Sequence, residues 1–168
     1  MPIDKPISVL FVCLGNICRS PTADGVFRGL VAKAGLADQI KVDSAGTAAW
    51  HIGKHPDPRT QKAAADRGYD LSQLQARQAV VADFEQFDLI LAMDQANYND
   101  LMLLQPEHSR ARLQLFLSYA PELGVSEVPD PYYGGQEGFE QVLDLVEIAG
   151  QNLLKQLVQQ YQLTTASV

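Results

Sequence analysis

The segment ISVLFVCLGNICRSPTA, residues 7–23, predicts a strand, a tight loop and the start of a helix. Residues 7–13 are mostly apolar and β-branched, as in a parallel strand that is buried on both faces. Ser20 is a good helix N-cap and Pro21 suits the first helical turn. Apolar residues then follow at helical spacing until Gly35, so the segment predicts the first half of a βαβ unit.

The rest of the chain repeats this alternation. Further strands are expected at residues 40–44, 87–93 and 113–117, and further helices at residues 59–67, 79–85, 95–104 and 137–161. Such alternation indicates an α/β fold, a parallel sheet with helices on both faces. A chain of 168 residues without a recognisable linker or repeat is typical of one domain, so we expect a single domain over 1–168 with a core from about 7 to 161.

Charge and cysteine content narrow the possible functions. The chain has 13 Lys and Arg against 20 Asp and Glu, and a net charge of −7 disfavours general nucleic-acid binding. No apolar run approaches the roughly 18 residues of a membrane span, and residues 1–6 do not resemble a signal peptide. Only Cys13 and Cys18 carry thiols. We therefore expect a cytoplasmic monomer with reduced cysteines and no membrane or nucleic-acid partner.

The loop of residues 13–20 is a candidate anion site. A helix N-terminus presents unpaired N–H groups, and the residues between Cys13 and Arg19 can aim successive amides at one point. Arg19 offers a planar fork for phosphate oxygens. Helix N-termini and nearby arginines favour the thiolate form of cysteines, and Ser20 can hydrogen-bond to the sulfur. We therefore interpret Cys13 as a nucleophile rather than only a buried strand residue.

Residues 9–23, VLFVCLGNICRSPTA, closely resemble the phosphate-binding loop of the low-molecular-weight protein tyrosine phosphatases. The similarity continues through residues 43–47, 76–78, 93–97 and 130–133 in the family's order. It implies four parallel strands flanked by helices, the phosphotyrosine phosphatase I-like fold. It also implies hydrolysis through phosphocysteine on Cys13, without metal or cofactor. Besides Cys13 and Arg19, the implied phosphate-binding residues are Leu14, Gly15, Asn16, Ile17, Cys18 and Ser20.

An acid must protonate the leaving oxygen of a phosphate ester. Asp43, Asp57, Asp94 and Asp130 all lie at strand ends or beside prolines, so spacing alone does not decide among them. The resemblance assigns this role to Asp130, which lies between Pro129 and Pro131.

Aromatic residues are the expected walls for a substrate ring. The resemblance implies this role for Tyr132 and Tyr133, which follow the acid in the sequence. Trp50 is a further candidate wall, or else a surface aromatic that covers the core. A deep pocket would favour phosphotyrosine-containing proteins over proteins that carry the shorter phosphoserine. Inorganic phosphate and vanadate are the expected inhibitors.

Asn16 is expected to maintain the shape of the loop. The resemblance implies that Ser44, Asp94 and Asn97 support the loop. Two positions depart from the family's pattern, because Leu74 stands where relatives have a histidine and Ala96 where they often have a serine.

Three other functions are considered. Cys13 and Cys18 with His51 and His55 form a formal zinc ligand set, but the long separation between the cysteines and the histidines in the sequence argues against it. We interpret His51, His55 and His108 as exposed loop residues. An arsenate reductase on the same fold would use Cys13 with glutathione. A phosphotyrosine-binding module without activity would not need an intact cysteine, arginine and aspartate.

The two cysteines also predict redox regulation. Both lie in one loop, and peroxide attacks reactive thiolates to give a sulfenic acid that a neighbouring thiol can trap. We therefore expect a reversible disulfide between Cys13 and Cys18.

Overall fold

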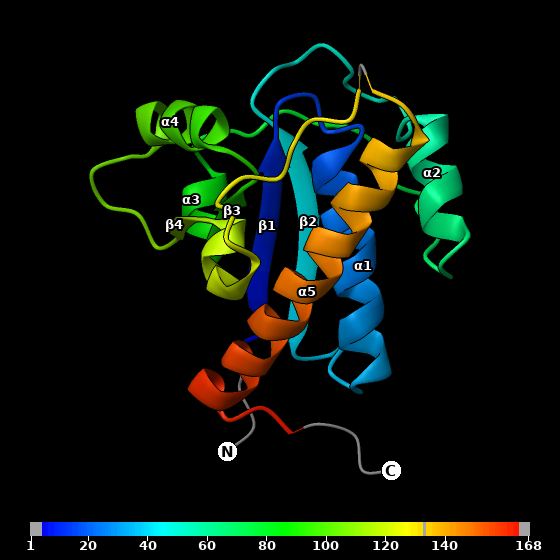
Figure 1. Ribbon diagram of the computed structural model, residues 1–168. Helices are drawn as coiled ribbons and strands as arrows, with labels where there is room; N and C mark the ends of the chain where they lie inside the picture. Colours follow the sequence, from blue (N-terminus) through cyan, green and yellow to red (C-terminus); the bar gives the residue numbers. More distant parts are fainter. Residues whose placement is uncertain (1–4, 133, 165–168) are drawn as a thin grey trace.

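The computed structural model describes residues 5–132 and 134–164, and a four-stranded parallel sheet forms its centre (Figure 1). Its strands are β1 (Ile7–Cys13), β2 (Ile40–Gly46), β3 (Leu89–Ala92) and β4 (Arg112–Leu115). Their order is β2-β1-β3-β4, and β1 pairs in parallel with β2 and with β3. The predicted α/β sheet is therefore confirmed, with the N-terminal strand in its interior.

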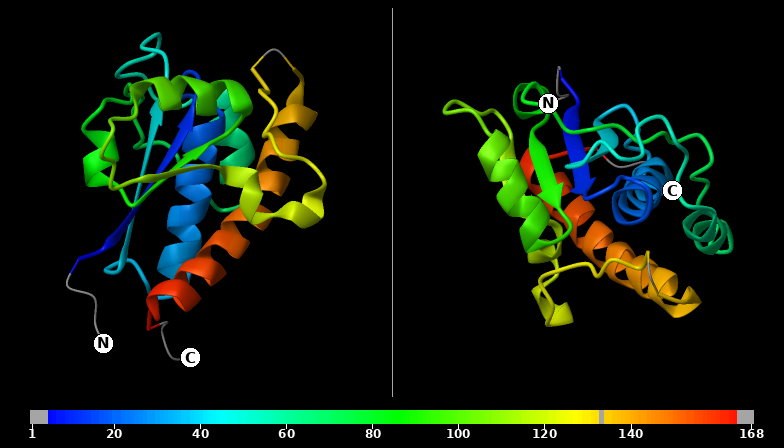
Figure 2. Two further views of the ribbon diagram at one scale, coloured as in Figure 1. Left: turned by 90° about the vertical axis from the view of Figure 1, so that its left-hand side faces the viewer. Right: turned by 90° about the horizontal axis from the view of Figure 1, so that it is seen from above.

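Helices cover both faces of the sheet (Figure 2). They are α1 (Arg19–Lys33), α2 (Pro58–Ala65), α3 (Asp83–Gln86), α4 (Gln95–Leu104) and α5 (Gln136–Tyr161). Alternate residues of β1 belong to two hydrophobic cores, because side chains alternate across a strand. Phe11 packs on the α1 and α5 side, whereas Leu10 packs on the α3 and α4 side.

Helices α1 and α5 approach each other closely at Gly150. A Cβ atom at this position would lie 3.2 Å from a side-chain carbon of Leu30 and 3.8 Å from one of Phe27. Because Gly150 has no side chain, α5 can pack tightly against Leu30 and Phe27 of α1. Phe27 in turn makes an edge-on contact with Phe11, with 5.7 Å between the ring centroids.

Some predicted boundaries are wrong. Helix α1 begins at Arg19 with Cys18 as its N-cap, rather than at the predicted cap Ser20. Residues 116–119 form a short 3-10 helix (Phe116–Tyr119), so β4 ends earlier than predicted. Helix α3 is shorter than predicted because Ala79 pairs its N–H with Gly46 O at the edge of β2. In the described part of the chain, no helix is long and apolar enough to cross a membrane.

Candidate active site

Cys13 ends β1 at the carboxyl edge of the sheet, between the ends of β2 and β3. Ligands of parallel α/β sheets bind at such a position. The Cys13 side chain is almost fully buried. The backbone N–H of Asn16 donates a hydrogen bond to Sγ over 3.2 Å, and the Ser20 hydroxyl lies 3.0 Å from Sγ. These two groups hold the sulfur in place within the loop.

Asn16 holds the curl of the loop. Its backbone has a φ of 57°, in the left-handed region that asparagine adopts more readily than most residues. The side-chain amide donates to Ser20 Oγ at 2.8 Å and accepts from the Arg77 N–H at 3.0 Å. Asn16 therefore connects the Cys13–Ser20 contact to the segment that borders β2. The hydroxyl of Ser20 also lies 3.3 Å from Ala45 O, to which it can donate.

The end of β2 lies directly against the loop. Gly46 is in register with Cys13, and Thr47 N–H donates to Cys13 O at 2.9 Å. A Cβ atom on Gly46 would lie only 2.8 Å from Leu14 O and 3.1 Å from the carbonyl carbon of Gly15. Any side chain at this position would collide with the loop backbone, so the absence of one permits this packing.

Arg19 is buried at the first turn of α1 and reaches across the site. Its Nη1 donates to Asp94 Oδ2 at 2.6 Å and to Val128 O at 3.1 Å, and its Nη2 lies 3.9 Å from Asp130. Burial opposes the charge of Arg19, but Cys13, Asp94 and Asp130 raise its pKa overall. The guanidinium thus stays charged beside the sulfur of Cys13.

Asp94, Asn97 and Ser44 were expected to support the loop. Asp94 caps α4, because its Oδ1 accepts the Asn97 N–H at 2.8 Å, while its other oxygen binds Arg19. Ser44 is buried near Asp24: burial raises the pKa of Asp24, and the Ser44 hydroxyl counteracts part of this shift. The Asn16 side chain thus donates to Ser20 and accepts from Arg77, and neither of these two hydrogen bonds involves Ser44.

The two departures from the family's pattern have different surroundings. Leu74 is half-buried and packs against the hydrophobic core, so it makes an apolar contact where relatives have a histidine. Ala96 is exposed in the first turn of α4.

Asp130 faces Arg19 from the loop that follows β4. Its side chain is 43% exposed, and Oδ1 accepts the N–H of Tyr132 at 3.1 Å. Pro129 and Pro131 flank it and restrict the backbone on both sides. Asp130 is therefore a solvent-accessible carboxyl on a stiff segment.

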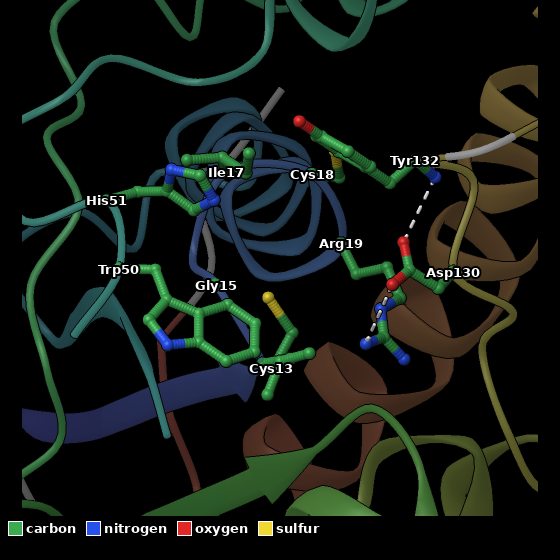
Figure 3. Close-up of a pocket in the computed structure, with 10 residues that line it drawn as sticks. Cys13, Gly15, Ile17, Cys18, Arg19, Trp50, His51, Asp130 and Tyr132 are labelled. Carbon is green, nitrogen blue, oxygen red and sulfur yellow. Dashed lines mark hydrogen bonds and ion pairs between the residues drawn. The ribbon is translucent and has the colours of Figure 1, made fainter. Parts of the chain in front are cut away.

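These groups surround a pocket of about 280 Å³ (Figure 3). The lining residues are Cys13, Leu14, Gly15, Ile17, Cys18, Arg19, Trp50, His51, Asp130 and Tyr132. Trp50 is 69% exposed and Tyr132 37% exposed, so aromatic surface reaches the mouth of the pocket. Tyr133 lies outside the described residues. The pocket therefore combines a thiol, a guanidinium and a carboxyl with apolar walls.

The histidines differ from one another. His51 is half-buried and lines the pocket beside Gly15, so its interpretation as an exposed loop residue was wrong. His55 is exposed, and its Nδ1 lies 2.9 Å from Leu74 O. Over residues 5–132 and 134–164, no three His, Cys, Asp or Glu side chains are grouped to hold a metal ion.

The sequence model of the family described as low molecular weight phosphotyrosine protein phosphatase matches residues 8–163. The chain belongs to this phosphatase family. A relative from Schizosaccharomyces pombe, named low molecular weight phosphotyrosine protein phosphatase, is 49% identical over 156 residues, which cover 91% of this chain and 98% of the relative.

Solved structures of low-molecular-weight phosphatases have the same fold. A protein tyrosine phosphatase from Entamoeba histolytica superposes with a TM-score of 0.87 at 39% identity, covering 94% of this chain and 99% of that one. A Drosophila arginine phosphatase superposes with a TM-score of 0.83 at 32% identity, covering 88% and 96%. These similarities to phosphatases do not favour the arsenate reductase alternative.

Sequence reasoning missed three residues around the low-molecular-weight phosphatase pocket. His51 lines it, Arg77 holds Asn16, and Arg59 contacts the loop of Asp130 through Tyr132 O. The similarity at residues 76–78 included Arg77 but gave it no role. The sequence around Arg59 contains an N-cap pattern but no signal for its distant contact.

Proposed function

We propose that the protein hydrolyses phosphotyrosine in proteins through a phosphocysteine intermediate on Cys13. The observation that carries this proposal is the pocket in which the sulfur of Cys13, the guanidinium of Arg19 and the carboxyl of Asp130 converge. A nucleophile, a cation for the equatorial oxygens and a proton donor are what phosphoryl transfer from an aryl ester requires.

In the first step, the Cys13 thiolate attacks phosphorus, and an S–P bond forms as the bond from phosphorus to the aryl oxygen breaks. Asp130, in its acid form, gives its proton to the departing oxygen. Arg19 and the loop N–H groups stabilise the charge on the phosphoryl oxygens. Asp94 supports this role, because its contact with Nη1 at 2.6 Å fixes the plane of the guanidinium.

In the second step, water attacks phosphorus and Asp130, now a carboxylate, takes a proton from it. The S–P bond breaks and inorganic phosphate leaves. Ser20 Oγ, 3.0 Å from Sγ, supports the departing thiolate with a hydrogen bond. Inorganic phosphate and vanadate are expected to inhibit by occupying the same position.

The pocket walls support an aryl substrate. Trp50 and Tyr132 offer apolar ring surface at the mouth, and Ile17 adds apolar surface within the pocket. A phosphotyrosine ring can fill this space while its phosphate reaches Cys13, whereas phosphoserine is shorter. Phosphotyrosine-containing proteins are therefore the proposed partners. We also propose, from the sequence, that the enzyme is a cytoplasmic monomer.

Substrate comparison tests this proposal directly. We expect steady turnover of p-nitrophenyl phosphate and a phosphotyrosine peptide in EDTA, and much less turnover of the matched phosphoserine peptide. A phosphoarginine peptide belongs in the same assay, because one structural relative is named an arginine phosphatase. Preference for phosphoarginine, or reduction of arsenate with glutathione in place of hydrolysis, would contradict the proposal.

Asp130→Asn should slow hydrolysis most for substrates with basic leaving groups, because an amide cannot supply the proton. We expect a loss of roughly 100- to 10,000-fold for phenyl phosphate. The loss should be smaller for p-nitrophenyl phosphate, whose leaving oxygen needs less protonation. Turnover rates across a series of substituted aryl phosphates measure the effect. An equal loss across the series would show that Asp130 is not the acid.

We also propose that the active site is regulated by reversible oxidation. Burial raises the pKa of Cys18 to about 12, so this residue remains a neutral thiol near pH 7. Peroxide would oxidise Cys13 to a sulfenic acid. The Cys18 sulfur would then displace water from it, forming the disulfide. Both cysteines line the same pocket, which supports their pairing.

Treatment with peroxide should inactivate the wild type, and dithiothreitol should restore its activity. Cys18→Ser should be active before treatment but lose activity irreversibly, because no second thiol traps the sulfenic acid. Bound phosphate should protect both proteins. Peptide mass mapping and recovered activity are the measurements. Equal recovery in both proteins, without an intramolecular disulfide in the wild type, would contradict the proposal.

A further inference from the structure

Arg59 connects the start of α2 to the loop that carries Asp130. Asp57 is the N-cap of α2 and accepts the backbone N–H of Arg59 at 2.8 Å. The same carboxylate binds the guanidinium of Arg59 through both oxygens, at 3.1 Å from Nε and 2.9 Å from Nη2. This hydrogen bonding outweighs burial and lowers the pKa of Asp57. The Arg59 side chain is therefore held in one orientation, although it is 48% exposed.

The held guanidinium contacts two further segments. Nη2 donates to Tyr132 O at 3.0 Å. The guanidinium carbon lies 5.5 Å from the ring centroid of Tyr132 and 4.8 Å from that of Phe139 on α5. Both distances are within the range of cation–π contacts. One side chain thus joins α2, α5 and the segment after Asp130.

Two arginines hold the Asp130 segment, one on each side of the acid. Arg19 donates to Val128 O, two residues before Asp130, and Arg59 donates to Tyr132 O, two residues after it. Pro129 and Pro131 lack backbone N–H groups, so they cannot anchor the segment as donors. The carbonyl groups that flank the acid are therefore important anchoring points.

We propose that Arg59 is a positioning residue that holds the Asp130 carboxyl in its working position by binding the carbonyl of Tyr132. This inference rests on the proposed function, in which Asp130 is the general acid. Tyr132 N–H also donates to Asp130 Oδ1 at 3.1 Å, so a shift of Tyr132 would move the carboxyl with it. Misplacement of a catalytic group by about 1 Å can cost about 100-fold in rate.

The test compares Arg59→Met with two related variants. Arg59→Lys keeps the charge but loses the planar fork. Asp57→Asn keeps an N-cap for α2 but weakens the hold on the guanidinium. Arg110→Met is the matched control, because Arg110 also binds one carboxylate, that of Asp88, whereas the contact with Tyr132 O is made by Arg59. Thermal unfolding verifies that each variant is folded.

Arg59→Met should lower kcat for phenyl phosphate by about 10- to 100-fold. We expect a clearly smaller loss for p-nitrophenyl phosphate and unchanged inhibition by inorganic phosphate. The other two variants should show the same pattern at smaller size, and Arg110→Met should match the wild type. In an Asp130→Asn background, Arg59→Met should change kcat by less than about twofold, because both changes remove the same proton transfer.

Two results separate failure of this inference from failure of the proposed function. If the wild type hydrolyses no aryl phosphate, the proposed function is wrong. If Asp130→Asn shows the leaving-group dependence but Arg59→Met slows all substrates equally, and the two losses multiply in the double variant, then Arg59 does not act through the acid. In that case the inference alone is overturned.

Discussion

Cys13→Ser should abolish turnover of p-nitrophenyl phosphate while leaving the binding of inorganic phosphate in place. A serine hydroxyl keeps the loop amides and Arg19 but ionises far less readily than a thiol, so the nucleophile is lost. We expect kcat to fall by roughly 10⁴-fold or more. Stopped assays at high enzyme concentration measure the residual rate, and calorimetry measures phosphate binding.

The outcome for Cys13→Ser decides whether Cys13 is the nucleophile. Loss of turnover with retained phosphate binding supports Cys13 as the nucleophile. Substantial turnover in the variant would show that another group attacks phosphorus, and would contradict the phosphocysteine mechanism. Trapping of radioactive phosphate on wild-type Cys13, but not on the variant, provides an independent measurement.

Arg19→Lys should be almost as damaging. Arg19 uses one nitrogen for both Asp94 and Val128 O, which leaves the rest of its fork for phosphate. A lysine ammonium cannot contact Asp94, Val128 O and two phosphate oxygens in one plane. We expect kcat/KM to fall by roughly 10³- to 10⁵-fold, as for arginines that stabilise phosphoryl transfer.

A second arginine of α1 provides the control for Arg19→Lys. Arg28 binds Asp24 on the same helix but does not line the pocket, so Arg28→Lys should retain turnover. Steady-state kinetics and phosphate inhibition of both variants decide the comparison. Similar losses in both would indicate a general effect on α1 rather than a contact of Arg19 with phosphate.

The parts of the fold that the sequence predicted are those with local causes. The apolar run of residues 7–13 determines β1, and α4 spans the predicted residues. The prediction of Ser20 as the N-cap of α1 was wrong, because the Ser20 hydroxyl contacts Asn16 and Cys13 instead. That arrangement depends on the curl of the loop, which no local propensity describes.

The candidate site divides in the same way. Cys13 and Arg19 are close in sequence, so their spacing predicted that they lie at one site, and both line the pocket. Asp130 could not be selected from the other aspartates by spacing and needed the resemblance to a known family. Arg59 and His51 reach the site only because the chain brings α2 and the segment after β2 over the pocket, so their positions depend on the tertiary fold.

The contact of Gly46 with the loop backbone has a consequence for protein engineering. The shape of residues 13–20 depends on the neighbouring strand as well as on their own sequence, because Leu14 O and Gly15 occupy the space of a side chain on Gly46. Transplanting these eight residues onto another parallel sheet would therefore not reproduce the site. A recipient scaffold must also supply a glycine in register with the cysteine, so the smallest transferable unit spans two adjacent strands.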